Sequence, residues 1–293
     1  MPKNSLKNLI RHLALSLGGQ GGKTKGAGGQ NSQARQGEQG GKTKGAGGLN
    51  SRKMNNFMLQ IKHLPMKKLV ILTGAGMSSE SGIRTFRDSG GLWEEYDVTE
   101  VATYDAWQRN RDLVLRFYNE RRRQLSGCSP NAGHTGLAQL EKHFDVQIIT
   151  QNIDDLHERA GSKKILHLHG ELTKARSTVD PSLIYDIGYR DISNSDKCEK
   201  GSQLRPHIVW FGEEVPMMDR AASLAAGADI FVMIGSSLNV YPAAGLVGYA
   251  PERASLWLID PNDVSVPVYR NVEVIKEKAA RGVEILTERL LNM

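Results

Sequence analysis

Apolar residues along 66–293 occur in short continuous runs that are separated by amphipathic stretches. The runs predict buried strands at 69–73, 146–150, 165–168, 207–211, 230–234, 255–259 and 272–275. The amphipathic stretches predict helices over 106–125, 131–143, 153–159, 217–226 and 279–291. Strands that are apolar on both faces and alternate with helices indicate a parallel, doubly wound sheet.

Residues 171–204 lack this rhythm. Scattered Ser, Asp and Lys replace the apolar runs there, and the alternation returns only after residue 204. We therefore predict one large α/β domain over 66–293, with a Rossmann-like sheet and with 171–204 as a small inserted subdomain.

Residues 1–65 have a different composition from the rest of the chain. The sequence QGGKTKGAGG occurs at 20–29 and again at 39–48, and large apolar residues are scarce around it. Such a segment cannot bury enough apolar surface to offset its chain entropy, so we predict a disordered basic tail. Its opening residues could form an amphipathic helix or a transit peptide. A further interpretation, which we favour, is a translated upstream repeat, with the working protein starting at Met66 or Met54.

The positive net charge belongs to this tail. The chain carries a net charge of +6, but residues 1–65 contain 11 Lys and Arg and one acid, which leaves −4 for 66–293. Composition therefore gives no reason to expect a nucleic-acid partner. Two cysteines, Cys128 and Cys198, suit a reducing cytosol, and no apolar run reaches the roughly 20 residues of a membrane helix. We expect a soluble, cytoplasmic protein without a membrane partner.

The first predicted strand ends in a glycine-rich turn. Leu69–Leu72 runs into Gly74-Ala75-Gly76, after which Ser78 and Ser79 can start a helix. A strand that ends on such a turn is typical of a phosphate site. Ser79 stands where a dehydrogenase fingerprint has its third glycine, and the chain continues into 84–91, which holds two arginines and an aromatic residue as a flap over a nucleotide. A glycine turn without a ligand remains the alternative.

Polar side chains follow other strands at the same predicted edge. Gln151, Asn152 and Asp154 come directly after 146–150, where open parallel sheets bind ligands, although Asp154 could merely cap the next helix. His169 ends a strand beside a glycine, where an imidazole can act as a general base or can be purely structural. The sequence 235–237, Gly-Ser-Ser, repeats the pattern after strand 230–234.

Five motifs now follow one another along the chain: GAGMSSESGIRTFR, TQNIDDLHERAG, LHGEL, RPHIVWFGE and GSSLNVYPA. In this order and spacing they resemble the sirtuin (Sir2) family of NAD-dependent protein deacylases, over essentially 66–293. The sequences at 83–87 and 117–122 resemble the class III branch, that of the bacterial CobB group. Residues 1–65 have no counterpart in the family.

The resemblance implies an enzyme that consumes NAD. The oxygen of an acyl-lysine attacks C1′ of the nicotinamide ribose, and the products are lysine, nicotinamide and 2′-O-acyl-ADP-ribose. His169 is the implied general base, and Asn152 is the second implied catalytic residue. The implied cofactor-binding residues are Gly74, Ala75, Gly76, Glu80, Thr85, Phe86, Arg87, Trp93, Gln151, Asn152, Ile153, Asp154, Gly235, Ser236, Ser237, Asp260 and Ala279.

Within this resemblance, Tyr118 and Arg121 match the pair that reads the carboxylate of succinyl-lysine. They lie three residues apart, hence on one helical face. The alternative is that Arg116 and 121–123 form a solvated basic face. The resemblance favours a deacetylase and desuccinylase acting on acylated protein lysines; an NAD glycohydrolase or ADP-ribosyltransferase, and a non-catalytic NAD or ADP-ribose module, remain the alternatives. The oligomeric state is left open.

The sequence departs from the family pattern in three ways. The family usually has four cysteines that bind a structural zinc, whereas Ser177 stands at the first of these positions and only Cys198 lies near the second pair, so we predict no metal. Packing of the subdomain, for instance through Ile184, Tyr185, Ile187 and Tyr189, is expected to take the place of zinc. Leu258 replaces an adenosine-contacting asparagine, with Asp260 as the substitute, and Ser236 replaces a threonine.

Overall fold

The computed structural model describes residues 65–84, 96–266 and 270–293, all within one compact unit spanning 61–293. The predicted disorder of residues 1–65 therefore lies outside the described residues, apart from Pro65. Among the described residues, no helix combines the length and the apolarity that a bilayer crossing requires.

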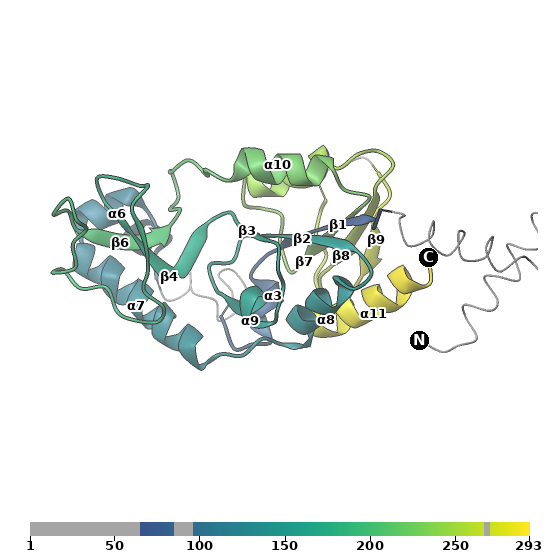
Figure 1. Ribbon diagram of the computed structural model, residues 1–293, viewed down its shortest axis with the longest axis horizontal. Helices are drawn as coiled ribbons and strands as arrows, with labels where there is room; N and C mark the ends of the chain where they lie inside the picture. The colour runs from purple at the N-terminus through teal and green to yellow at the C-terminus, as the bar shows by residue number, and fades with distance from the viewer. Residues whose placement is uncertain (1–64, 85–95, 267–269) are drawn as a thin grey trace, which may run out of the picture. The chain divides into compact units, whose positions relative to one another are not determined.

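A six-stranded sheet forms the larger part of the fold (Figure 1). Its order is β3-β2-β1-β7-β8-β9, and every neighbouring pair is parallel. The strands are β1 (Lys68–Thr73), β2 (Asp145–Thr150), β3 (Ile165–His167), β7 (Ile230–Ile234), β8 (Ser255–Ile259) and β9 (Glu273–Ile275). The predicted α/β class with a doubly wound parallel sheet is confirmed.

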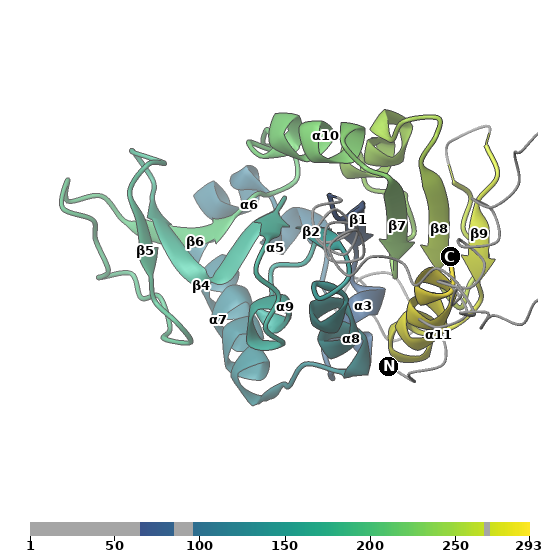
Figure 2. The same cartoon turned by 45° about the vertical axis from the view of Figure 1, so that its right-hand side comes forward.

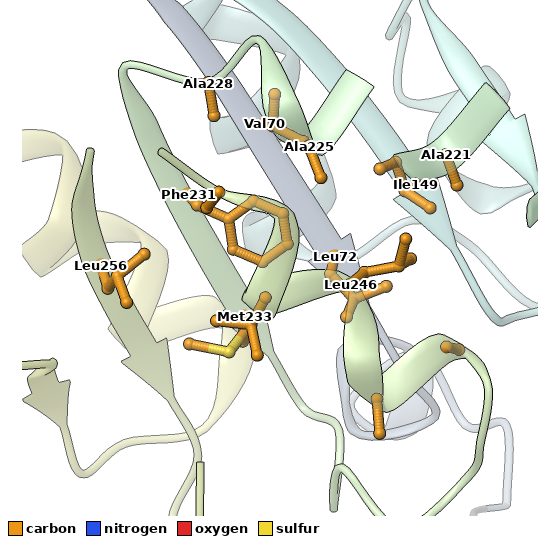
Figure 3. Close-up of a cluster of buried hydrophobic side chains, with 14 of the residues drawn as sticks. Val70, Leu72, Ile149, Ala221, Ala225, Ala228, Phe231, Met233, Leu246 and Leu256 are labelled. Carbon is orange, nitrogen blue, oxygen red and sulfur yellow. The ribbon is translucent and has the colours of Figure 1, made fainter. Parts of the chain in front are cut away.

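The two faces of the sheet are covered by different helices (Figure 2). Alternation along β1 sends Val70 and Leu72 into one cluster of buried side chains, and Leu69 and Ile71 into another. The first cluster includes side chains of α10 (Met218–Ala226) and of the 3-10 helix η1 (Ala243–Tyr249); Figure 3 shows its centre around Phe231 and Met233. The second includes side chains of α8 (Ala132–Leu140) and α11 (Ala279–Leu291).

A second, smaller sheet is antiparallel, with the order β5-β4-β6. Its strands are β4 (Gly170–Ser177), β5 (Ile184–Asp186) and β6 (Leu204–Ile208). It shares a buried cluster with helices α5 (Val98–Val101), α6 (Tyr104–Arg109) and α7 (Arg111–Gly127). Tyr185 and Ile187 pack against this cluster as expected, whereas Ile184 and Tyr189 are exposed.

Two predicted elements differ from the structure. The helix expected over 106–125 is divided into α6 and α7 at Asn110, whose side chain accepts a hydrogen bond from Leu113 N and so caps a new helix. The strand expected over 207–211 is wrong, because β6 ends at Ile208 and pairs with β4 in the small sheet. An apolar run does not by itself show which sheet it joins.

Buried Arg122 ties α7 to the small sheet. Its Nε donates to the carbonyl oxygen of Leu172 at 2.7 Å, and its Nη1 donates to Oδ1 of Asn119 at 2.6 Å. Asn119 in turn exchanges hydrogen bonds with both backbone groups of Ile192. Arg122 is thus part of the framework and does not belong to a solvated basic face.

Candidate active site

A cavity of about 1050 Å³ opens at the carboxyl ends of the parallel strands. Residues that follow β1, β2, β7 and β8 line it, and His169, Tyr118 and Arg121 line it as well. The size lies at the upper end of the range for small-molecule sites. Strand β1 lies between β2 and β7, so loops from both halves of the sheet meet here.

The glycine turn after β1 packs directly against the turn after β7. A Cβ added at Gly74 would lie 2.7 Å from the carbonyl oxygen of Gly235, and one added at Gly235 would lie 2.5 Å from the backbone of Gly76. Gly235 also has a φ of +58°, which favours glycine. Glycine is therefore required at these positions by the close approach of two backbones, before any ligand is considered.

This packing also uses two of the backbone N–H groups of the glycine turn that was predicted to be a phosphate site. Gly74 N donates to Ile234 O at 3.0 Å, and Gly76 N donates to Gly235 O at 2.9 Å. These two N–H groups are already bonded, so they are not the phosphate donors that the glycine turn suggested. The helix that follows, α3 (Gly76–Ser79), is a single turn.

Asn152 connects the loops that follow β1 and β2. Its side-chain Nδ2 donates to Gly74 O and to Ser78 Oγ, each at 3.0 Å, while its backbone N donates to Thr150 Oγ1. The side chain is nearly buried, at 8% exposure. These bonds fix its orientation at the wall of the cavity.

Asp154 is buried beside the same serine. Ser78 Oγ donates to one carboxylate oxygen at 2.9 Å, and Leu156 N donates to the other at 3.2 Å. Burial raises the pKa of this carboxyl to about 6, although the two hydrogen bonds oppose the shift. The alternative that Asp154 only caps α9 (Leu156–Arg159) accounts for one oxygen and leaves the bond to Ser78 unexplained.

Gln151 holds both sides of the cavity. Its side-chain Nε2 donates to Ser236 Oγ at 3.0 Å, and its backbone oxygen lies 3.0 Å from Nδ1 of His169. A carbonyl oxygen can only accept, so Nδ1 carries the proton and Nε2 of the neutral ring is the acceptor. Burial lowers the pKa of His169. The ring is thereby kept as a base beside the cavity.

His167, on the same strand, has a different environment. Its Nε2 lies 2.8 Å from a carboxylate oxygen of Glu158, and its Nδ1 lies 3.2 Å from Asn152 O. The pKa of His167 is raised: burial would lower it, but the hydrogen bond to Glu158, the charges of Glu158 and Glu171 and the bond to Asn152 O together outweigh burial. It supports the loop that carries Asn152 and does not line the cavity.

Ser236, Ser237 and Asp260, which follow β7 and β8, line the cavity, as does Ala279 at the start of α11; the binding of adenosine there stays a prediction. Leu258 is buried in the core and does not line the cavity, so its side chain is not placed to contact a ligand there.

Glu80 is placed differently from the prediction. It is exposed, does not line the cavity, and accepts a hydrogen bond from Ala280 N at 2.9 Å. The first N–H groups of a helix lack partners within the helix and attract a carboxylate, so Glu80 serves the start of α11.

Tyr118 and Arg121 both line the cavity, as their spacing on α7 predicted. Tyr118 is 3% exposed, and its hydroxyl oxygen accepts a hydrogen bond from Trp210 Nε1 at 3.0 Å. The guanidinium carbon of Arg121 lies 5.5 Å from the centre of the Phe117 ring. Arg116 and Arg123, by contrast, are exposed and do not line the cavity.

The family's zinc position holds a cluster of hydroxyl and thiol groups. Ser202 Oγ lies 2.9 Å from Ser177 Oγ and 3.1 Å from Cys198 Sγ. Hydrogen bonds with Ser177 and then Ser202 lower the pKa of the Cys198 thiol to about 7. One thiol and two hydroxyls do not fit a tetrahedral zinc site. Across the described ranges, no three His, Cys, Asp or Glu side chains group to hold a metal, and the absence of zinc stays a prediction.

Four predicted cofactor residues, Thr85, Phe86, Arg87 and Trp93, lie outside the described residues. The other predicted site residues line the cavity, with the exception of Glu80. Sequence reasoning missed the role of Ser78, whose hydroxyl joins Asn152 and Asp154; its place directly after the glycine turn was the available signal. It also missed Trp210, which lines the cavity behind Tyr118.

The Sir2 family model matches residues 74–242, more than half of the chain. The chain belongs to the Sir2 family. Among curated relatives, a protein of Bacteroides thetaiotaomicron is 53% identical over 234 residues, covering 77% of this chain and 99% of the relative. One from Helicobacter pylori is 52% identical over 228 residues, covering 78% and 97%. Both are named NAD-dependent protein deacylase.

Solved Sir2 structures resemble the fold closely. A Sir2 homologue in complex with NAD superimposes with a TM-score of 0.70 at 35% identity, covering 81% of this chain and 94% of the other. A Sir2 variant with a deacetylated p53 peptide and 3′-O-acetyl-ADP-ribose gives 0.67 at 29% identity, covering 80% and 98%. The resemblance stated from the motifs is confirmed.

Proposed function

We propose that this Sir2 protein is an NAD-dependent protein-lysine deacylase that produces free lysine, nicotinamide and 2′-O-acyl-ADP-ribose. The observation that carries the proposal is His169, whose Nδ1 is bound to Gln151 O so that Nε2 is left as a proton acceptor beside the cavity. This chain matches both relatives over nearly their whole length, and their names support the same activity. A cytoplasmic location stays a prediction.

The lining residues fit NAD. The cavity is large enough for a dinucleotide together with an acyl chain, and its wall combines backbone, hydroxyl, amide and carboxylate groups. NAD supplies a ribose carbon that can exchange its bond to nicotinamide for a bond to the acyl oxygen of the substrate. Gln151, Ser236 and Asp260 are the groups that would bind ribose hydroxyls.

The chain's own residues then have separate tasks. Nε2 of His169 accepts a proton from a ribose hydroxyl, and burial keeps the ring neutral for this purpose. Asn152, held by Gly74 O and Ser78 Oγ, orients the ribose. Asp154 would bind the nicotinamide carboxamide.

For the acyl group we propose succinyl as well as acetyl. Arg121 offers a planar fork that matches a carboxylate, and Tyr118 adds a hydroxyl beside it in the same cavity. The test is Arg121→Met, assayed on succinyl and acetyl versions of one peptide. Loss of a charge-assisted hydrogen bond should lower the succinyl-to-acetyl ratio of kcat/KM by about 10- to 150-fold.

Arg116→Met is the matched control. It removes a guanidinium from the same helix, but from an exposed position outside the cavity, so the ratio should stay at the wild-type value. If Arg121→Met lowered both activities equally, Arg121 would support the fold or the peptide backbone, and the assignment of the acyl pocket would be wrong.

A further inference from the structure

The side chain of Trp210 is held by several contacts. Arg205 stacks over its ring, with the guanidinium carbon 3.4 Å from the ring centre, and the Trp107 ring packs against it at a tilt of 36°, with ring centres 5.7 Å apart. The backbone N of Trp210 donates to Glu213 at 2.8 Å. Trp210 is 2% exposed, so its indole edge has one well-defined direction.

Glu213 and Arg205 make this arrangement rigid. Arg205 Nη1 and Nη2 donate to the two carboxylate oxygens of Glu213 at 2.6 and 3.0 Å, a two-point contact that fixes both groups. Burial would raise the pKa of Glu213, but the bonds from Arg205 and from Trp210 N lower it, so Glu213 stays ionised. The indole is therefore ordered before a substrate binds, so binding loses no side-chain entropy in immobilising it.

The direction of the hydrogen bond between Trp210 and Tyr118 is unambiguous. An indole nitrogen can only donate, so the Tyr118 oxygen is the acceptor across 3.0 Å. The proton of the Tyr118 hydroxyl is then left to be donated elsewhere. Burial raises the pKa of Tyr118, so the hydroxyl keeps this proton throughout the working range of pH.

We propose that Trp210 is a specificity-determining positioning residue, which acts through Tyr118 to favour acyl groups that end in a carboxylate. The indole N–H occupies the acceptor side of the Tyr118 oxygen and turns the hydroxyl proton toward the carboxylate that Arg121 binds. Hydrogen bonds in such a chain polarise one another, so the donation to the carboxylate is strengthened. A neutral acetyl group has no atom to use this donor. The inference rests on the proposed desuccinylase activity.

The test is Trp210→Phe, which keeps an aromatic ring against Arg205 and removes the N–H. The succinyl-to-acetyl ratio of kcat/KM should fall about 3- to 10-fold, the loss of one neutral hydrogen bond. The change should be in KM for the succinyl peptide, because the carboxylate is remote from the reacting carbonyl. In a Tyr118→Phe background the same substitution should leave the ratio at the value of the single Tyr118→Phe variant, since Trp210 acts through that hydroxyl.

Trp257→Phe is the matched control, because it shortens a buried tryptophan that lies in another cluster, makes no bond to Tyr118 and does not line the cavity. It should leave the ratio at the wild-type value. If Trp210→Phe does not fold, benzothienylalanine in place of the four tryptophans removes the N–H with little change of shape, and the same fall in the ratio is expected.

The outcomes separate this inference from the proposed function. Suppose that Arg121→Met loses activity only on the succinyl peptide, while Trp210→Phe keeps the wild-type succinyl-to-acetyl ratio of kcat/KM. This result would overturn the role of Trp210 and would still support the desuccinylase activity. Full additivity of Trp210→Phe with Tyr118→Phe would also overturn it. A wild-type enzyme that does not remove the succinyl group from the peptide would refute both.

Discussion

Nδ1 of His169 donates a hydrogen bond to the carbonyl oxygen of Gln151 across 3.0 Å. Gln151 also bonds through its side chain to Ser236, on the opposite side of β1. One residue therefore fixes the tautomer of the base and joins the two loops that line the cavity. The orientation of the base depends on the backbone of the loop after β2, which in turn is fixed by Asn152.

The first prediction concerns the pH dependence of turnover. Because burial lowers the pKa of His169, its base form persists as the pH falls, and kcat/KM should begin to decrease only below about 6.5. Asp154, with a pKa raised to about 6, titrates in the same region. A pH profile of kcat/KM on an acetyl-lysine peptide measures this limb, and a midpoint above about 7 would contradict the assignment.

The Ser78→Ala variant shows whether His169 or Asp154 causes the acid limb of the pH profile. The bond from Ser78 lowers the pKa of Asp154, so removing it should move the Asp154 titration to higher pH. If the acid limb belongs to Asp154, the limb moves upward with this substitution. If it belongs to His169, which has no bond to Ser78, the midpoint stays where it was.

The second prediction concerns stability at acid pH. His157 is buried against His134, with ring centres 4.8 Å apart, and burial holds its pKa well below the ordinary value. The unfolded chain takes up a proton there below about pH 6.5 while the folded protein does not, so the free energy of unfolding should fall as the pH falls. His157→Gln should flatten this fall by about 1 kcal/mol per pH unit between about pH 6 and 5.

Urea denaturation at several pH values measures this slope. His143→Gln is the control, because His143 is exposed and its replacement should leave the slope unchanged. The remaining titrating groups are common to all three proteins, so the differences report the substituted residue. Equal slopes for His157→Gln and wild type would mean that His157 is protonated in the folded state.

The third prediction separates the arginines of α7. Arg122→Met removes the donors to Leu172 O and Asn119 Oδ1, both in a buried setting, and should lower the free energy of unfolding by about 1–3 kcal/mol. Arg123 makes an exposed ion pair with Asp191 at 3.0 Å, so Arg123→Met should cost less than about 1 kcal/mol. Chemical denaturation compares the two, and equal losses would refute the structural role of Arg122.

Patterns that depend on near neighbours predicted the fold well. The run Ile230–Ile234 is apolar on both faces because helices cover both sides of the sheet, and that is what the structure shows. The boundary at Asn110 was missed because its capping bond to Leu113 competes with a helix that the apolar spacing would otherwise continue. Local competition of this kind leaves a weak signal in the sequence.

Contacts between distant residues were harder to predict. Glu80 follows the glycine turn closely and was assigned to the cofactor, but its partner Ala280 N lies 200 residues away. Trp210 was part of a predicted strand, and only the folded chain brings it to Tyr118. The strand-end residues were found because the carboxyl ends of neighbouring parallel strands meet at one edge, a rule that needs no knowledge of individual contacts.

The central claim, an NAD-dependent deacylase with His169 as its base, is tested most directly by nicotinamide release from NAD by the full chain. The account predicts release only when an acyl-lysine peptide is present, in equal amount to the deacylated peptide. His169→Ala should lower the rate at least about 100-fold. Nicotinamide release at the same rate without the peptide, or binding of NAD without any release, would contradict it.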